Sequence, residues 1–442
     1  MILLICLFLN IILFHQAFFW VYFWQVKEYR LDRFFASFET KYDYYKVIKN
    51  QFNLKTWFRP KLTFRSIFTL VLLFILIFFI PIFCLLPAII FFPIISFIFI
   101  FILSPPFLLL KKFLVFKATK KMTHYKGLVI GITGSFGKSS TKEILFSVLS
   151  KHFSVSKTLK NNNSQIGVAQ TVLKQLNMNS DIFIVEMGAY KIGEIKATCR
   201  IVNPKIGIIT GLGNQHLSLF KTLANIKKAK YELINSLPKN GFSLIAEKDF
   251  SLKDVSNIKT SIDHIEFTYQ KINFSVPLIG QKLIRNVMAV IKTAQHLGLS
   301  LSQIKADLKK INPNLFSPKL INLSKNIYIV DNSYNSSIEG FTNIIEYVSS
   351  LSEFKKIIIT PGLIELGKTS HQDHLQLGKL LKNIDQIIVT QPNYFTELNF
   401  NKNAQLITSP NQIIKKLKEL NQPNTLFIFQ GRIPEIIIKS LK

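Results

Sequence analysis

A stretch without a single charged residue, from 66 to 110, constrains this chain more than any other feature. It reads "SIFTLVLLFILIFFIPIFCLLPAIIFFPIISFIFIFILSPPFLLL", roughly twice the ~20 residues that cross a bilayer as a helix. Pro81 and Pro87 lie near its middle, where a helical hairpin can turn. Residues 1–24 form a second apolar run. That run lacks the basic start and small-residue cleavage site of a signal peptide, so it predicts a transmembrane helix.

Basic residues flank both apolar regions. Segment 25–65 carries Lys27, Arg30, Arg33, Lys41, Lys46, Lys49, Lys55, Arg59, Lys61 and Arg65, and Lys111 and Lys112 follow the apolar segment 66–110. Positive flanks favour the cytoplasmic side. The sequence thus predicts a multi-pass protein of the cytoplasmic membrane, with an outside N-terminus, a basic cytoplasmic segment at 25–65 and a cytoplasmic remainder. A re-entrant hairpin at 66–110 would leave the remainder on the same side.

After Lys121 short apolar strands alternate with amphipathic helices, as in "GLVIGIT" followed by "STKEILFSVLSKHF". A second such series starts near residue 326 with "NIYIVDNS". This alternation is typical of a parallel sheet covered by helices. Two prolines in "NPNLFSPKL", residues 312–320, mark the expected boundary. We therefore expect two α/β domains, at 111–316 and 317–442.

The distribution of charge indicates which kinds of binding partner the protein can have. The 442 residues carry a net charge of +30, but the lysines are scattered and form no Arg-rich tract of the kind that binds nucleic acid. Lysines that face water or anionic membrane lipids are the favoured interpretation. The three cysteines, Cys6, Cys84 and Cys199, lie far apart in the sequence, which argues against a disulfide framework or a Cys-rich zinc site.

The segment "GITGSFGKSS", residues 131–140, joins an expected strand to an expected helix. Backbone amides at the start of a helix favour anions. The strict nucleotide-loop pattern requires a glycine at 132, where this chain has Ile132. Lys138 is nevertheless placed to reach terminal phosphates, and the Ser139 hydroxyl to hold Mg²⁺.

Several further motifs follow in order: "KNNNSQIGVA", "VEMGAYKIGEI", "GIITGLGNQHLSLF", "AKYELI", "LIGQKLIRN", "IVDNSYNSS", "PGLIELG" and "NTLFIFQGR". Together with the glycine loop they resemble the Mur ligase family, ATP-dependent amide-forming enzymes of peptidoglycan synthesis, over roughly residues 125–442. The branch that adds D-alanyl-D-alanine is the most similar. The resemblance implies a P-loop central ATPase domain and a Rossmann-like C-terminal α/β domain. It also implies that ATP converts a carboxylate of a muramoyl peptide precursor, nucleotide- or lipid-linked, into an acyl phosphate that D-Ala-D-Ala attacks.

The resemblance assigns roles to individual residues. The catalytic residues are Lys138, His216 and Lys230, the last as a carbamate made from CO₂. The ATP-binding residues are Gly134, Ser135, Gly137, Lys138, Ser139, Ser140, Asn286, Asp331, Tyr334 and Asn335. Ligands for two Mg²⁺ ions are Ser139, Glu186, His216 and Lys230, and substrate contacts are Asn163, Ser164, Glu365 and Arg432.

The chain departs from the family pattern where the acceptor peptide is held. The changed positions are Ser164, Gln165, Lys282, Pro318, Lys319, Ser336, Ser337 and Ile338. In the family a UDP-sugar-binding domain precedes the glycine loop, and here the apolar regions occupy its place. The membrane region is expected to hold the ligase near lipid-linked muropeptide or beside other wall-synthesis proteins.

Three alternatives remain open at this point. A Mur-type ligase of the same class could form another wall-peptide amide, although the Cys-rich zinc insertion of the amidating relative is missing. A transporter ATPase would need charged residues inside its spans, and segment 66–110 has none. A nucleic-acid-binding protein would show steeply salt-dependent binding.

Overall fold

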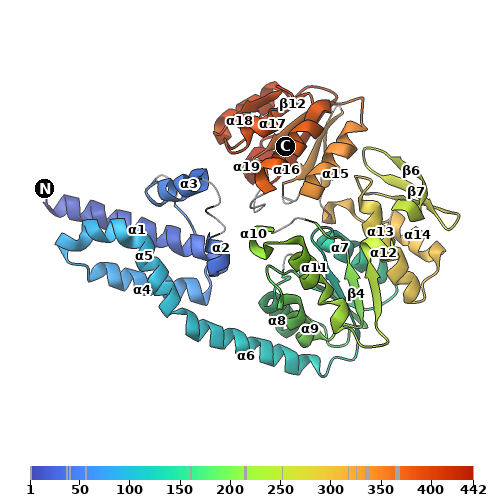
Figure 1. Ribbon diagram of the computed structural model, residues 1–442, viewed down its shortest axis with the longest axis horizontal. Helices are drawn as coiled ribbons and strands as arrows, with labels where there is room; N and C mark the ends of the chain where they lie inside the picture. The colour runs from blue at the N-terminus through green and yellow to red at the C-terminus, as the bar shows by residue number, and fades with distance from the viewer. Residues whose placement is uncertain are drawn as a thin grey trace. The chain divides into compact units, whose positions relative to one another are not determined.

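The computed structural model describes residues 2–35, 38, 41–54, 57–159, 162–213, 217–250, 252–316, 318–324, 326–333, 338–363 and 369–441, without the side chains of 41, 42, 43, 46, 218, 247 and 324. The chain forms two compact units (Figure 1). We call Met1–Leu114 the N-terminal unit and Val115–Lys442 the C-terminal unit.

The N-terminal unit is built from apolar helices. Helix α1 (Ile2–Val26) packs against both α4 (Phe64–Phe78) and α5 (Leu85–Ile102). Leu13, Ala17, Leu73 and Phe92 are among the core residues they bury. The other elements are α2 (Leu31–Phe35), α3 (Lys41–Gln51) and the 3₁₀ turn η2 (Ile82–Cys84). Helix α6 (Ser104–Met122) begins in this unit and ends in the C-terminal unit.

Within the described ranges, two helices are long and apolar enough to cross a membrane, at Leu3–Val26 and Ile82–Ile102. The first half of the hairpin expected at 66–110 is shorter than these two, since α4 has 15 residues and ends before Pro81. At 1.5 Å per residue it is roughly 22 Å long, less than a typical hydrocarbon core. The sequence therefore predicts the turn near Pro81 better than the length of the helix before it.

Part of the basic segment at 25–65 packs against α1. Trp20 Nε1 donates a hydrogen bond to Gln51 Oε1 at 3.1 Å, and His15 Nδ1 lies 3.0 Å from the Gln51 carbonyl oxygen. All three side chains are buried. Helix α3 is thus held at the middle of α1, an arrangement that the charge pattern alone does not predict.

The first half of the C-terminal unit contains a five-stranded parallel sheet of order β2-β3-β1-β4-β5. Its strands are β1 (Leu128–Thr133), β2 (Val155–Lys157), β3 (Ile182–Glu186), β4 (Ile206–Ile209) and β5 (Phe242–Ile245). The helices of this half are α7 (Lys138–Leu149), α8 (Gln165–Lys174), α9 (Glu194–Val202), α10 (Leu217–Phe220), α11 (Leu223–Tyr231), α12 (Ala246–Asp249), α13 (Leu283–His296) and α14 (Leu301–Lys309).

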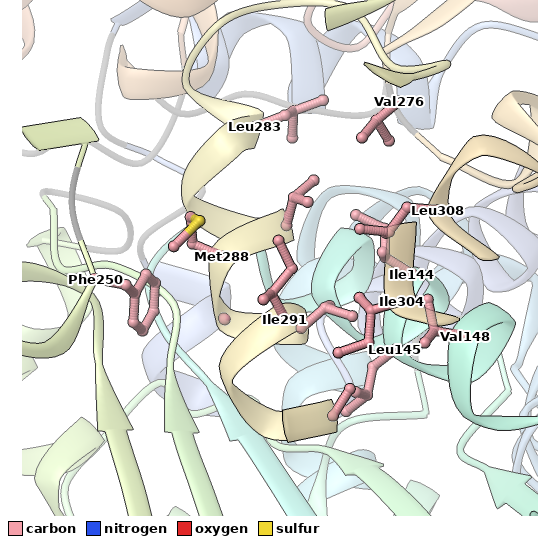
Figure 2. Packing of buried hydrophobic residues seen from close by; sticks show 14 of the residues in the cluster. Ile144, Leu145, Val148, Phe250, Val276, Leu283, Met288, Ile291, Ile304 and Leu308 are labelled. Atoms are coloured by element: carbon pink, nitrogen blue, oxygen red, sulfur yellow. The ribbon is translucent and has the colours of Figure 1, made fainter. Parts of the chain in front are cut away.

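Helices α7 and α13 meet in the largest core cluster (Figure 2). Ile144, Leu145 and Val148 of α7 face Ile291 of α13 there. Helix α7 buries one face, which includes Ile144, Leu145 and Val148, whereas α13 is buried around most of its circumference. This packing fixes α7, and with it the glycine loop that precedes it.

Three further strands form a small antiparallel sheet of order β6-β7-β8: β6 (Ser256–Thr260), β7 (Ile265–Tyr269) and β8 (Ile272–Val276). The second half of the unit has a six-stranded sheet of order β13-β12-β11-β14-β10-β9. Its strands are β9 (Lys319–Ser324), β10 (Ile327–Asn332), β11 (Lys355–Thr360), β12 (Gln386–Val389), β13 (Ala404–Leu406) and β14 (Thr425–Gln430). Its helices are α15 (Ile338–Ser349), α16 (Ser370–Leu380), α17 (Phe395–Leu398), α18 (Pro410–Glu419) and α19 (Glu435–Lys439).

The mixed α/β class agrees with the alternation in the sequence, but the sheets are not wholly parallel. Strand β9 runs antiparallel to β10. Only two residues separate Ser324 from Ile327, and so short a link cannot make the crossover that parallel neighbours need. The antiparallel edge strand follows from that link.

Candidate active site

The glycine loop lies between β1 and α7, at the carboxyl edge of the parallel sheet. Gly134 and Gly137 have positive φ angles of 152° and 80°. A Cβ on Gly134 would lie 2.3 Å from Thr210 Oγ1, and one on Gly137 would lie 2.8 Å from Asn286 Oδ1. Both positions therefore need glycine, and the loop closes tightly in front of the α7 amides, which favour an anion.

Two side chains hold this loop in place. Ser135 Oγ donates to the Gly213 carbonyl oxygen at 3.1 Å. Lys138 Nζ donates to the carbonyl oxygens of Gly134, at 2.7 Å, and Ser135, at 3.2 Å. Burial lowers the pKa of Lys138, and the charge of Glu186 opposes that shift. The ammonium is therefore presented on the inner side of the loop, where a phosphate would meet it.

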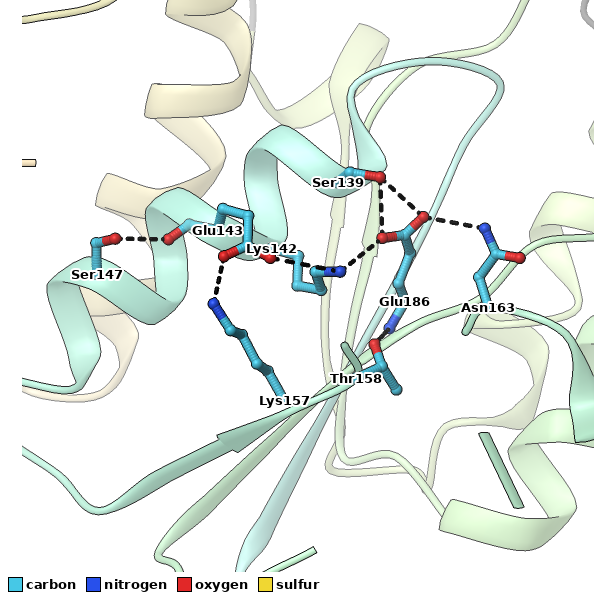
Figure 3. A network of polar contacts seen from close by, with 8 residues as sticks. All are labelled: Ser139, Lys142, Glu143, Ser147, Lys157, Thr158, Asn163 and Glu186. Carbon is cyan, nitrogen blue, oxygen red and sulfur yellow. Dashed lines mark hydrogen bonds and ion pairs between the residues drawn. The ribbon is translucent and has the colours of Figure 1, made fainter. Parts of the chain in front are cut away.

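Glu186, the last residue of β3, is at the centre of a polar network (Figure 3). The residue is 1% exposed, and its carboxylate accepts hydrogen bonds from Ser139 Oγ at 3.0 Å and from Asn163 Nδ2 at 3.1 Å. Lys142 Nζ forms an ion pair with Glu186 Oε2 at 3.0 Å. The β1–β3 register, which places Ile132 opposite Glu186, brings this carboxylate beside the loop.

The donor atoms in this network suit Mg²⁺, which prefers carboxylate and hydroxyl oxygens. Ser139 and Glu186 already face each other across the site. The part of the chain that the structure describes contains no cluster of three or more His, Cys, Asp or Glu side chains arranged for a metal. His216, a third expected ligand, lies outside the described residues.

Lys142 is a site residue that the sequence interpretation missed. It lies four residues after Lys138 on α7, and this spacing puts two side chains on one face of a helix. This spacing is the feature of the sequence that could have predicted a role for Lys142 beside Lys138. Lys142 is almost fully buried and compensates the buried charge of Glu186.

Removing Lys142 tests this compensation. We expect Lys142→Met to lower the free energy of unfolding by about 3 kcal/mol, because it leaves a buried carboxylate without its cation. Lys151→Met is the matched control, since Lys151 pairs with Asp307 while 35% exposed, and its loss should cost less than about 1 kcal/mol. Melting temperatures in neutral detergent compare the two. Equal shifts for both variants would contradict the role of Lys142.

Lys230, on α11, is the second lysine of interest. It is 3% exposed. Burial lowers its pKa to about 7, with the nearby charge of Lys138 acting in the same direction and Glu194 and Glu232 opposing. Lys230 therefore has a substantial neutral fraction near pH 7 and lies within electrostatic reach of the loop.

A cavity of about 490 Å³ opens between the two halves of the C-terminal unit. The first half contributes Gly137, Ser140 and Asn286 to its lining, and the second half contributes Asn332 and Glu339. Asp331 is not among the lining residues, and its Oδ1 accepts hydrogen bonds from Ser333 N at 3.1 Å and Ser333 Oγ at 2.6 Å. The neighbouring Asn332 faces the cavity in its place, because successive residues of a strand point to opposite sides.

The remaining expected site residues are placed differently. Ser164 caps α8, accepting a hydrogen bond from Gly167 N at 3.2 Å. Arg432 is exposed just after β14. Lys282 forms an ion pair with Glu346 of α15 at 2.9 Å. Tyr334, Asn335 and Glu365 lie outside the described residues, as do Ser336 and Ser337.

The segment that contains most of the glycine loop is similar to a known protein family. Residues 132–259 match the model of the Mur ligase middle domain. The UDP-N-acetylmuramoyl-tripeptide–D-alanyl-D-alanine ligase of Buchnera aphidicola subsp. Acyrthosiphon pisum is 32% identical over 283 residues, which cover 57% of this chain and 61% of that enzyme. The Escherichia coli enzyme of the same name is 29% identical over 295 residues, covering 59% of this chain and 64% of the relative. The chain thus spans about three fifths of the length of these relatives.

Solved structures give the same picture of the fold. MurF from Thermotoga maritima, in complex with ADP, superposes with a TM-score of 0.67 at 26% identity, over 75% of this chain and 84% of that one. MurF from Acinetobacter baumannii gives a TM-score of 0.68 at 23% identity, over 75% and 80% of the two chains. The chain therefore carries a Mur ligase middle domain, and the proteins that it resembles in sequence and fold are the D-alanyl-D-alanine-adding ligases of the Mur ligase family.

Proposed function

We propose that this protein is an ATP-dependent ligase that joins D-Ala-D-Ala to the carboxylate of a muramoyl peptide, a precursor of peptidoglycan. The convergence of Lys138, Ser139, Glu186 and Lys230 near one edge of a parallel sheet carries the proposal. ATP supplies the phosphoryl group that turns the carboxylate into an acyl phosphate, and Mg²⁺ neutralises the phosphate charge.

The residues around the loop bind and orient the nucleotide. The α7 amides and Lys138 hold the phosphates. Asn286, which lines the cavity beside the loop, holds the nucleoside together with residues at the end of β10 and just after it. These are Asp331, Asn332, Tyr334 and Asn335. The close contact between Gly137 and Asn286 supports this arrangement, because it joins the phosphate end to the cavity.

Ser139 and Glu186 would hold one Mg²⁺, and His216 with a carbamylated Lys230 would hold a second. A lysine ammonium would repel a metal ion, whereas a carbamate offers the anionic oxygens that Mg²⁺ accepts. Only a neutral amine reacts with CO₂, and the lowered pKa of Lys230, about 7, provides that form. Asn163, which donates to Glu186, is poised beside the metal site, and Ser164, Glu365 and Arg432 would contact the substrates.

ATP turnover tests this proposal and separates it from its alternatives. Purified protein is supplied with nucleotide-linked or lipid-linked muramoyl tripeptide, with and without D-Ala-D-Ala. We expect sustained ADP release only when donor and dipeptide are both present. Turnover with the donor and a different amine would indicate another Mur-type ligase, and turnover without either would indicate a membrane ATPase.

We further propose that the N-terminal unit attaches the ligase to the cytoplasmic membrane. Large apolar side chains are exposed on all three of its apolar helices, including Leu3, Phe78 and Phe101. A soluble protein rarely exposes so much contiguous apolar surface. Attachment would keep the enzyme close to lipid-linked precursors and to other wall-synthesis proteins.

Reporter fusions test the orientation. We expect a reporter after Lys442 to be active in the cytoplasm, because both basic flanks favour that side. A reporter inserted near Leu85, at the start of α5, should be periplasmic or shallowly embedded. A C-terminal reporter found in the periplasm would contradict the proposal, since ATP is absent there.

A further inference from the structure

Cationic side chains from three distant parts of the sequence lie at one end of the apolar helices of the N-terminal unit. Arg30 follows α1, Arg65 lies in the first turn of α4, and Lys111 lies in α6, just beyond α5. Gln25, near the end of α1, bonds through Nε2 to the Lys61 carbonyl oxygen at 2.9 Å, so the end of α1 lies beside the start of α4. Helices α1, α4 and α5 pack alongside one another (Figure 1), which places these cations together.

Arg65 is held in a defined orientation. Its guanidinium carbon lies 3.8 Å from the centroid of the Tyr29 ring and 4.8 Å from that of Phe107. Its Nη2 donates to Ser104 Oγ at 3.2 Å. Such stacking fixes the plane of a guanidinium while leaving donor groups for an anion.

The carboxylates nearby are already paired with other arginines. Asp32 pairs with Arg30 and Glu28 with Arg33, each at 2.6 Å. Among the described residues, neither Arg65 nor Lys111 forms an ion pair with a carboxylate. Burial lowers the pKa of Lys111, and the charges of Arg65 and Arg30 act in the same direction, against Glu28. The site therefore has a surplus of positive charge that an anion would relieve.

Apolar surface begins directly beside these cations. Phe64, on α4 next to Arg65, is 72% exposed, and Leu109, on α6 two residues before Lys111, is 66% exposed. A ligand with an anionic head and an apolar tail satisfies both parts of this surface. A soluble anion would use only the cations.

We propose that Arg65 and Lys111 bind the phosphate of an anionic membrane lipid whose acyl chains lie against α4 and α6. The proposal rests on the membrane attachment proposed above, and it adds a defined headgroup site to it. Arg65 contributes a fork of donors and Lys111 a second charge, as phosphate recognition requires.

Binding of short-chain lipids to the full-length protein in neutral detergent tests the site. Isothermal titration compares dioctanoyl phosphatidylglycerol with dioctanoyl phosphatidylcholine at low salt. We expect saturable binding of the anionic lipid only, weakened about fivefold by Arg65→Gln and about fivefold by Lys111→Gln, since each cation near a membrane surface contributes about that factor. Lys112→Gln is the matched control, because Lys112 is the next residue of α6 and is exposed.

Three outcomes would overturn the site: equal binding of both lipids, equal weakening by Lys112→Gln and Lys111→Gln, or displacement of the lipid by inorganic phosphate at similar concentrations. The Arg65→Lys variant is the control for misfolding. It keeps the positive charge, so it should bind the anionic lipid more tightly than Arg65→Gln does. Ligase turnover with soluble substrates, measured on the same samples, should be unchanged in all variants. The headgroup site and the ligase activity can therefore fail independently.

Discussion

Replacing Lys138 with alanine should reduce ATP-dependent product formation by at least about a hundredfold, the effect expected when a preorganised donor to developing charge is lost. Within the part of the chain that the structure describes, Lys138 Nζ donates hydrogen bonds only to two backbone carbonyls of its own loop, so the fold should survive its removal. The rate of ADP release with both substrates present is the measurement. The melting temperature reports on the fold.

Lys174→Ala provides the control for this change. Lys174 is exposed at the end of α8 and takes no part in the polar network around Glu186. Its replacement should leave the rate unchanged. Near-normal turnover by Lys138→Ala would show that the glycine loop does not handle the transferred phosphate, and the assignment of the loop would then be wrong.

Substitutions of Lys230 should reduce product formation as strongly as Lys138→Ala does. The alanine and arginine variants should differ in their response to an added carboxylate. Lys230→Ala should be inactive but partly restored by a small added carboxylate such as acetate, which replaces the carbamate oxygens. Lys230→Arg should be inactive and not restored, because a guanidinium cannot lose its charge and react with CO₂. Turnover with and without added carboxylate compares the two variants.

The pH dependence follows from the same residue. Burial lowers the pKa of Lys230 to about 7, so the amine becomes protonated as the pH falls below 7 and the carbamate can no longer form. Activity at low bicarbonate should therefore fall below pH 7, and added bicarbonate should partly restore it. Full activity of the Lys230→Arg variant would contradict the carbamate hypothesis, and Lys230 would then have a structural role only.

The sequence was sufficient to place the elements that carry the loop. The run from Leu128 to Thr133 forms a buried parallel strand and the segment after Gly137 forms a helix, as the alternation of apolar patterns predicts. The partners of Glu186 were only partly foreseen. No sequence motif singles out Lys142, and its ion pair with Glu186 is visible only in the structure.

Other differences arise from side-chain direction and from tertiary contacts. Asp331 and Asn332 are neighbours in β10, and only the structure shows that Asn332 faces the cavity. In the N-terminal unit the apolar composition is plain from the sequence, but the hydrogen bonds of Gln51 to α1 join residues 31 and 36 positions apart. The periodicity of apolar residues does not predict such pairs. It indicates which face of a helix or strand is buried, but not which other element packs against that face.

Transfer of oxygen from the donor carboxylate to phosphate tests the central claim most directly. The muramoyl tripeptide is labelled with ¹⁸O in its terminal carboxylate and incubated with ATP, Mg²⁺ and D-Ala-D-Ala. Attack of the amine breaks the bond between the acyl carbon and the bridging oxygen, so that oxygen leaves with the phosphate while the amide forms. We predict one ¹⁸O atom in each phosphate released, with an equal amount of pentapeptide product by mass spectrometry. Unlabelled phosphate would mean that ATP is simply hydrolysed, and it would contradict the assignment of this protein as a ligase.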